Sequence, residues 1–304
     1  MLRTSRNQPK NYLRQYRQRI EQTLLIIVIT VIASGLFILD SSQTFAQNQL
    51  QVWFFDVGQG DAIFIRAPGG EQILIDGGPD SSILSKLGSI MLPWDREIDV
   101  VMFTHPDADH ISGLIPVLER YQVKKIYETG ARSRTQTAKR LDQLIKAEPA
   151  EHIFVTEKEE LIIGELKIDF IHPEKPMLGE YPKESNDSSL VIRLDYGQTS
   201  ILLVGDATLA VEERIGQLSG DIDVLKVGHH GSLSSTGSEF LNKIDPEFAV
   251  IQVGLDNRYN HPHPAVYDRL LRHQTKVFRT DQDGDILLLS DLSEPVILSR
   301  PLPF

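Results

Sequence analysis

Cysteine is absent from all 304 residues of the chain. Its absence excludes disulfide bonds, thiolate metal ligands and a lipid attached to a cysteine. Any metal ion must therefore take nitrogen and oxygen ligands, which suits zinc, manganese or magnesium. We also find no internal repeat, no low-complexity tract and no linker after residue 47. With 41% hydrophobic and 24% charged residues, the composition is typical of a soluble globular protein with a sizeable core.

One long apolar run, Leu24–Leu39, follows a basic stretch in which Glu21 is the sole acidic residue. A small residue, Ala46, then marks a plausible cleavage site for a signal peptide. The run is short for a full membrane span of about 20 residues, which favours a cleaved signal peptide slightly over a single membrane anchor. A buried core helix fits poorly with the basic flank. Both of the first two alternatives bring the N-terminal segment to a membrane and place residues 48–304 outside the cytoplasm.

The net charge of −11 also excludes a generally basic surface. Six of the 31 basic residues but only two of the 42 acidic ones precede residue 48, so the exported part is more acidic still. Such a surface repels nucleic acid, and a polyanionic substrate would need a local basic patch or bridging metal ions. One dense basic cluster could hold a phosphate chain or form a solvated helix face: Arg132, Arg134, Lys139 and Arg140.

Short apolar segments bounded by Gly, Pro, Asp or Asn predict strands. We expect them at Gln51–Asp56, Ala62–Arg66, Gln72–Asp76, Val100–Thr104, Lys125–Tyr127, His152–Val155, Leu166–His172, Ser189–Leu194, Ser200–Val204, Val224–Val227, Phe248–Val253, Val277–Thr280 and Ile286–Leu289. Helical patterns lie at Ser81–Leu87 with Gly88 as a stop, Ile111–Tyr121, Thr135–Lys146, Leu209–Leu218, Ser235–Lys243 and Pro264–Leu271. This order is typical of an α/β protein with two sheets packed between helices.

Four potential metal ligands lie within six residues, directly after the apolar run Val100–Phe103: His105, Asp107, Asp109 and His110. A strand that ends in such a cluster delivers imidazoles and carboxylates to one point at the edge of a sheet. Neighbouring ligands on a tight loop can reach two adjacent divalent ions, and a bound ion lowers the pKa of its water to near neutrality. The pattern predicts a hydrolytic centre with one or two metal ions. The alternative is a solvated turn of chance composition.

Two later segments carry further candidate ligands. Asp206 follows the apolar strand Ile201–Val204 and could bridge two ions, although an Asp at the end of a strand is more often a turn residue or the N-cap of the helix that follows. His229 and His230 follow the strand Val224–Val227. Because adjacent side chains of an extended chain point to opposite faces, at most one of the pair points where His105 points. The other would orient it or contact the substrate.

Several loops carry polar residues of less specific pattern. The turns at residues 56–61 and 76–78 require glycine and carry the acidic or amide residues Asp56, Gln59, Asp61 and Asp76. The loop at 257–263 carries Asn257, Arg258 and His261. His261 is a candidate catalytic acid or phosphate contact, or an ordinary exposed histidine.

Taken together, these motifs resemble the metallo-β-lactamase fold, and in particular the ComEC-type soluble domain of competence DNA-uptake proteins. The resemblance covers most of residues 50–290. It rests on Phe55–Ala62, Leu74–Gly78, Thr104–Gly113, Asn186–Leu190, Gly205–Ala207, Leu225–Ser232 and Asn257–Pro264. It implies a four-layer αβ/βα sandwich over residues 48–304 with the site at the sheet edges, as a stand-alone exported member after an N-terminal segment of residues 1–47.

The resemblance also implies roles for individual residues. The family's His-x-His-x-Asp-His signature maps onto His105, Asp107, Asp109 and His110, with Asp107 in place of the middle histidine. Asp206 matches the bridging carboxylate, His229 or His230 the last ligand, and Asp76 a buried supporting residue. Asn186 lies near the place of a further family histidine that this chain lacks.

These assignments imply two metal ions, zinc or manganese with magnesium possible. The first ion would have His105, Asp107, Asp206 and Asn186 as ligands, and the second Asp109, His110, Asp206 and His229. The extra oxygen ligands at the first site favour manganese or magnesium over zinc.

We therefore predict a metal-dependent hydrolase, acting as a two-metal phosphodiesterase or nuclease on extracytoplasmic DNA. Asp109 would orient the nucleophile, while His261, Asn257 and Arg258 would contact the phosphate or the leaving group. One alternative is a hydrolase of a non-nucleotide ester, lactone or lactam. Another is a metal-stabilised domain that binds DNA without cleaving it. We expect a monomer.

Overall fold

The computed structural model describes residues 17, 19–31, 49–157 and 159–299. The chain divides into residues 1–48 and residues 49–304. In the first unit the described residues are helical and exposed. Among the described residues, no helix combines the length and apolar character needed to cross a membrane. The rest of the predicted apolar run, residues 32–39, and the predicted cleavage site at Ala46 lie outside the described residues.

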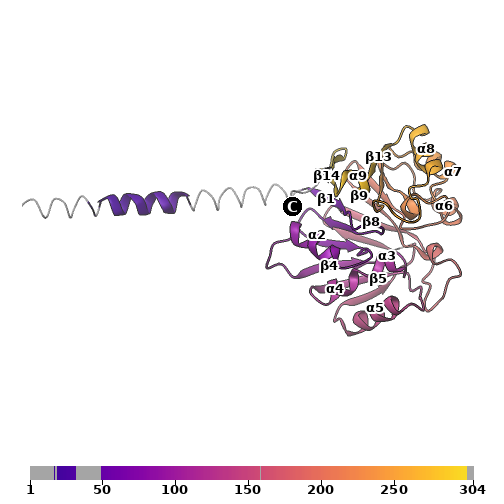
Figure 1. The fold of residues 1–304 in the computed structure, drawn as a ribbon, viewed down its shortest axis with the longest axis horizontal. Coiled ribbons are helices and arrows are strands. Elements are labelled where there is room, and N and C mark those ends of the chain that lie inside the picture. The colour runs from indigo at the N-terminus through magenta and orange to yellow at the C-terminus, as the bar shows by residue number, and fades with distance from the viewer. Residues whose placement is uncertain (1–16, 18, 32–48, 158, 300–304) are drawn as a thin grey trace, which may run out of the picture. The chain divides into compact units, whose positions relative to one another are not determined.

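Two mixed sheets form the framework of the second unit (Figure 1). The first has eight strands in the order β15 (Val296–Ser299), β14 (Ile286–Ser290), β1 (Leu50–Phe54), β2 (Ile63–Arg66), β3 (Gln72–Ile75), β4 (Glu97–Met102), β5 (Gln122–Glu128) and β6 (Glu151–Phe154). The second has seven in the order β13 (Lys276–Arg279), β12 (Phe248–Ile251), β11 (Val224–Lys226), β10 (Thr199–Leu203), β9 (Val191–Tyr196), β8 (Leu166–His172) and β7 (Glu160–Ile163).

Helices cover the outer face of each sheet. Those beside the first sheet are α2 (Ser82–Ile90), α3 (Ala108–Ile111), α4 (Leu114–Leu118) and α5 (Gln136–Ala147), and those beside the second are α6 (Leu209–Ile215), α7 (Ser238–Ile244) and α8 (Pro264–Arg272). Three short helices lie in the connections: η1 (Ser185–Ser188), η2 (Gly228–Gly231) and α9 (Thr280–Asp283). The predicted α/β four-layer sandwich is confirmed.

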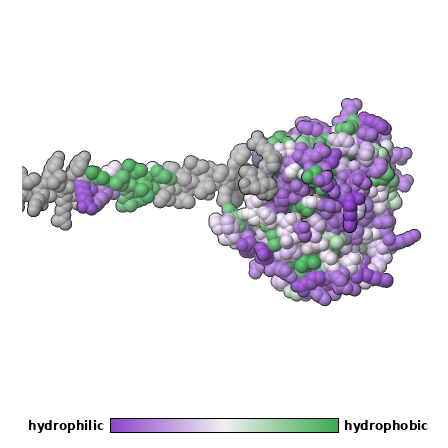
Figure 2. Space-filling model, in the orientation of Figure 1, coloured by the Kyte–Doolittle hydropathy of each residue, from purple (hydrophilic) through white to green (hydrophobic). Residues whose placement is uncertain are grey.

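Alternation along the strands builds the layers. Successive side chains of a strand point to opposite faces, so Val52 and Phe54 of β1 pack between the sheets while Trp53 packs under the helices. Likewise Val100 of β4 faces the second sheet and Val101 faces the helices. The outer surface is mostly hydrophilic, with scattered small apolar areas on the face in Figure 2. The buried apolar residues therefore form three cores, one between the sheets and one beneath each helical layer.

The structure corrects several predicted elements. Gly88 does not end α2, because it faces open space and a helical glycine costs only about 1 kcal/mol relative to alanine. The predicted helix Ile111–Tyr121 is interrupted at Gly113, where an added Cβ would lie 1.9 Å from the carbonyl oxygen of Gly77. The edge strands β7 and β15 were not predicted. Both have four residues that alternate between exposed and half-buried, which is a weak pattern.

Candidate metal centre

Loops from both sheets meet at the carboxyl ends of their parallel strands. In the first sheet β3 and β4 run parallel, so Asp76 after β3 lies beside the 104–110 loop after β4. In the second sheet β10, β11 and β12 run parallel, which brings Asp206 after β10 beside η2 after β11. The fold thereby delivers the predicted ligand residues from distant parts of the sequence to one place.

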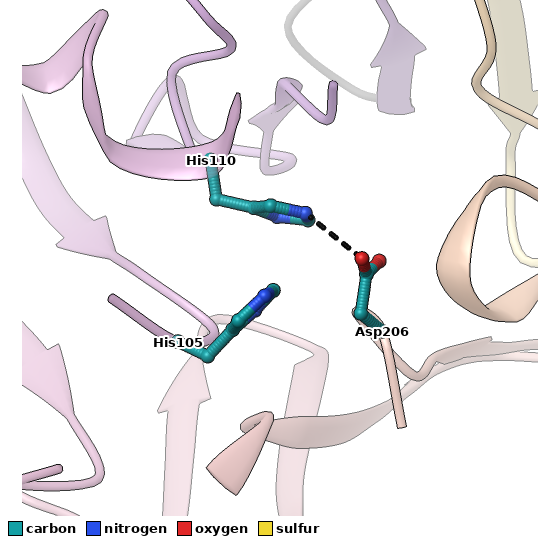
Figure 3. Close-up of side chains that lie close together, drawn as sticks. All are labelled: His105, His110 and Asp206. Atoms are coloured by element: carbon teal, nitrogen blue, oxygen red, sulfur yellow. Dashed lines mark ion pairs between the residues drawn. The ribbon is translucent and has the colours of Figure 1, made fainter. Parts of the chain in front are cut away.

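His105, His110 and Asp206 converge from these loops, with both imidazoles directed toward the carboxylate side (Figure 3). The His110 Nε2 atom lies 3.3 Å from Asp206 Oδ2, and the centroids of the two imidazole rings are 4.2 Å apart. One potential ligand atom from each of the three residues lies within 4.8 Å of the others. This spacing allows all three to bind a common ion.

Hydrogen bonds orient the two imidazoles. The Thr104 hydroxyl donates to Asp76 Oδ2 at 2.8 Å and contacts His105 Nδ1 at 3.0 Å. Because a carboxylate accepts only and the hydroxyl proton is already used, His105 Nδ1 must carry a proton that it donates to Thr104. His110 Nδ1 likewise lies 2.8 Å from Asp76 Oδ2. We therefore assign Nδ1–H to both rings, which directs each Nε2 toward the centre.

His230 is oriented in the same way from the second sheet. Its Nδ1 donates to the main-chain oxygen of Gln252 at 2.9 Å. Its Nε2 lies 3.4 Å from Asp109 Oδ2 and 3.6 Å from Asp206 Oδ2. Asp109, His110 and His230 form a second group whose ligand atoms lie within 4.8 Å of one another.

His229 points elsewhere, although it is adjacent in sequence. Both histidines have left-handed backbone conformations, with φ of 46° and 53°, which is strained for residues with a Cβ. The His229 side chain is 29% exposed, and its Nε2 lies 3.8 Å from Asp206 Oδ2. Its Nδ1 contacts Ser234 Oγ at 3.0 Å and Asn186 Nδ2 at 3.1 Å. The geometry thus favours His230 over His229 as a ligand, and places Asn186 against His229.

The donor set fits divalent metal ions. Several buried side-chain atoms have no hydrogen-bond partner among the described residues. Four of them belong to these candidate ligands: Nε2 of His105, His110 and His230, and Oδ1 of Asp206. Buried polar atoms are nearly always satisfied, and leaving one unpaired costs about 1–3 kcal/mol. Imidazole nitrogens and carboxylate oxygens are the ligands that zinc and manganese accept. These residues would therefore hold metal, while the identity and number of ions stay predictions.

Electrostatics at the centre also favour added positive charge. Burial raises the pKa of Asp206, but the imidazoles of His230 and His110 outweigh burial and hold it well below the usual range. Burial lowers the pKa of His230, yet the carboxylates of Asp206 and Asp61 outweigh burial and raise it to about 10. The pKa of His110 is also raised, because Asp206 and Asp76 overcome its burial. Protons and metal ions would compete for the same nitrogen atoms.

A buried ion pair that the sequence reasoning missed lies beside this centre. Lys226, the last residue of β11, pairs with Asp61, and its side chain is 0% exposed. Burial raises the pKa of Asp61, but the Lys226 ammonium together with the imidazoles of His230 and His110 outweighs burial and holds this pKa below its usual value. A lysine within the otherwise apolar stretch Val224–Val227 was the available signal. Thr104 and Gln252, which orient imidazoles here, were also not predicted as site residues.

A cavity of about 450 Å³ opens beside Asp109. Predicted site residues from three loops line it together with Tyr259: Gln59, Asp109, Asn257 and Arg258. Arg258 donates to the Tyr259 hydroxyl at 2.6 Å and lies over its ring. Since Asp109 belongs both to the cavity and to a candidate ligand group, a substrate bound here would reach the metal centre.

The loop before α8 places His261 near His229, with 5.8 Å between ring centroids. Asn257 shapes this loop, because its side chain donates to the His261 carbonyl at 2.7 Å and accepts from the His261 amide at 2.9 Å. Burial, with the nearby imidazoles of His229 and His230, lowers the pKa of His261 to about 4. The imidazole is therefore neutral at pH 7.

Two further predicted residues, Asp107 and Asp56, belong to neither of the ligand groups described above. Asp107 accepts from Ser185 at 2.8 Å and lies 3.6 Å from His105 Nε2, at the edge of the centre. Asp56 accepts from the Gly58 amide within its turn, and Asp206 does not begin α6, whose N-cap is Thr208.

The basic cluster is partly neutralised. Arg132 pairs with Glu128 at 2.6 Å, and Arg140 pairs with Glu119 at 2.7 Å. These ion pairs disfavour a phosphate site, and of the four basic residues only Lys139 and Arg140 lie on the face of a helix, α5.

Comparison with known families matches residues 55–254 to the metallo-β-lactamase superfamily. The chain belongs to this superfamily. Its members are usually metal-dependent hydrolases, and the fold binds divalent metal ions. The predicted resemblance to ComEC-type competence proteins is also confirmed as sequence similarity.

The curated relatives include "ComE operon protein 3" of Bacillus subtilis (strain 168), 35% identical over 78% of this chain and 32% of the relative. They also include "Competence protein ComA" of Neisseria gonorrhoeae, 27% identical over 78% of this chain and 32% of the relative. The chain thus spans about a third of the length of the curated relatives it matches. Among solved structures, the metallo-β-lactamase fold protein YhfI of Bacillus subtilis has a TM-score of 0.54 and 14% identity, covering 80% of this chain and 100% of its own. That likeness shows the fold alone.

Proposed function

We propose that the chain is a two-metal phosphodiesterase that cleaves DNA outside the cytoplasm. The observation that carries the metal-dependent part is the set of buried, unpartnered Nε2 atoms of His105, His110 and His230, the last two of which lie 3.3 and 3.6 Å from Asp206 Oδ2. The similarity of this chain to a protein that is named for competence supports DNA as the substrate class. The acidic surface agrees with a role for metal ions in bringing a polyanion to the site.

We assign one ion to His105, Asp107 and Asp206, and the other to Asp109, His110 and His230. A neutral imidazole has a single free lone pair, so His110 can serve one ion only, whereas the two oxygens of Asp206 can reach both. When bound, a pair of divalent ions supplies Lewis acidity and a water molecule of lowered pKa. Zinc or manganese suits these donors, and magnesium suits the more oxygen-rich first set.

The chain's own groups would position the substrate. Asp109 lies between His230 and the cavity, so its carboxylate would accept a hydrogen bond from the attacking water. The Arg258 guanidinium at the cavity wall would bind a phosphate oxygen. Because its imidazole is neutral at pH 7, His261 would donate a hydrogen bond to the phosphate or leaving oxygen rather than transfer a proton as an imidazolium.

We further propose that residues 1–47 form a signal peptide or membrane anchor and that residues 48–304 are the exported hydrolase domain. The basic flank followed by apolar residues supports this assignment. Similarity to a protein named for competence agrees with a site outside the cytoplasm. We expect the chain to act as a monomer.

The test is incubation of the purified full chain with linear DNA and with Mn²⁺, Mg²⁺ or Zn²⁺ in turn. We expect metal-dependent cleavage that chelation abolishes and that Asp109→Asn lowers by at least about 100-fold. Asp56→Asn is the matched control, because Asp56 lies in a turn outside the ligand groups, and it should retain cleavage. Cleavage of a carboxylic ester or lactam but not of DNA would reject the proposal, as would equal DNA binding without cleavage in wild type and His105→Ala.

A further inference from the structure

Lys226 is a fully buried cation beside the candidate metal centre. It ends β11, and its side chain is 0% exposed. A buried ammonium is costly unless paired with opposite charge and hydrogen-bonded. The residues around Lys226 must therefore supply negative charge and hydrogen-bond acceptors for its ammonium group.

The contacts of Lys226 form such a site. Its Nζ atom pairs with Asp61 Oδ2, lies 3.9 Å from Asp206 Oδ1 and donates to the Gly205 carbonyl at 3.2 Å. All three neighbours of the Nζ atom are oxygen atoms of the kind that bind hard metal cations. The Lys226 side chain thus ends among oxygen atoms beside the candidate metal centre.

The same carboxylates belong to a geometrically complete ligand group. Asp61, Asp206 and His230 each offer one atom, and these atoms lie within 4.8 Å of one another. His230 Nδ1 lies 3.3 Å from Asp61 Oδ1, on the side of the carboxylate group that Lys226 does not pair with. Without the lysine, the buried carboxylates of Asp61 and Asp206 would lie close together beside His230 and would lack the positive charge that offsets their mutual repulsion.

We propose that the Lys226 ammonium is a tethered cation that occupies a third cation position, formed by Asp61 and Asp206, and thereby excludes a divalent ion from it. The lysine makes Asp61 a support for His230 rather than a metal ligand. It leaves the Asp206 carboxylate available to the ions bound by His105 and His110. The number of metal ions is then limited by a residue that binds none of them.

This inference rests on the proposed metal centre but not on the proposed substrate. Its test is the number of Mn²⁺ ions bound per chain, measured without DNA by equilibrium dialysis and elemental analysis. The full chain is compared as wild type, Lys226→Met, and the double variant Asp61→Asn with Lys226→Met. Methionine keeps the length of the lysine stem without its charge, and the double variant removes both members of the ion pair.

Lys226→Met should bind one more Mn²⁺ ion per chain than wild type, whereas the double variant should not. If Lys226→Met folds poorly, Mn²⁺ should restore its thermal transition while leaving that of the double variant nearly unchanged. Equal Mn²⁺ stoichiometry in folded wild type and Lys226→Met would overturn the inference, as would a fold that Mn²⁺ fails to restore. Absence of bound Mn²⁺ from wild type would instead reject the metal centre itself, and DNA cleavage plays no part in either outcome.

Discussion

The inner and outer sides of the candidate centre both carry imidazoles, and they differ in what surrounds each ring. On the inner side, His105, His110 and His230 are buried, and each has its Nδ1 atom held by a neighbouring group. On the outer side, His229 and His261 are partly exposed, and burial lowers the pKa of both imidazoles despite the opposing effect of the Asp206 carboxylate. Full burial beside carboxylates, rather than residue type, therefore separates candidate ligands from candidate substrate contacts.

Removing one ring from each side should give the largest contrast in metal affinity. His230→Ala deletes a buried Nε2 that faces Asp109 and Asp206, so we expect metal binding to weaken by more than about 100-fold. This loss is larger than the one expected when a group that only supports a ligand is removed. His229→Ala is the matched variant and should change affinity by less than about tenfold. Titration with Zn²⁺ or Mn²⁺ measures both, and the reverse order of effects would exchange the roles of the two histidines.

Removing the Thr104 hydroxyl tests the support of the inner rings. This group links Asp76 to His105, so Thr104→Val should weaken metal binding by about 10–100-fold. Thr104→Ser keeps the hydroxyl and should bind nearly as wild type. Equal affinities for the valine and serine variants would show that the hydrogen bond does not orient His105.

The pH dependence of metal binding should also distinguish the inner histidines from the outer ones. His230 has a pKa of about 10 in the metal-free chain, so an ion that binds at pH 7 must displace its proton. Affinity should therefore rise by about tenfold per pH unit for each proton displaced, and fall as the pH is lowered. Calorimetry in buffers of different ionisation enthalpy measures the number of protons released when metal binds. His261→Gln should leave this number unchanged, because His261 is already neutral.

The smallest effect on metal binding should come from His261. His261→Gln should keep metal affinity within about twofold of wild type, because the ring lies outside the ligand groups. Cleavage of DNA should nevertheless fall by about 10²–10⁴-fold if the ring contacts the reacting phosphate. Metal titration and initial rates on the same preparation test both parts, and a parallel loss of metal would place His261 on the inner side.

Much of this arrangement could be predicted from the sequence because its signals are local. The strand before His105 and the dense ligand motif after it lie within a few residues of each other, and alternation along the strands predicted the layers. The partners of each side chain are not local. Lys226 pairs with Asp61, which is 165 positions earlier, so only the folded chain shows that this lysine belongs to the centre. The choice between His229 and His230 likewise depended on the left-handed turn that separates them.

The most direct measurement is an anomalous difference map from crystals of the full chain grown with Mn²⁺ or Zn²⁺. The account predicts peaks within bonding distance of His105 and Asp206 and of His110, Asp109 and His230, with Lys226 Nζ remaining against Asp61. Ordered ions that bind only elsewhere on the chain, with these side chains free of metal, would contradict it.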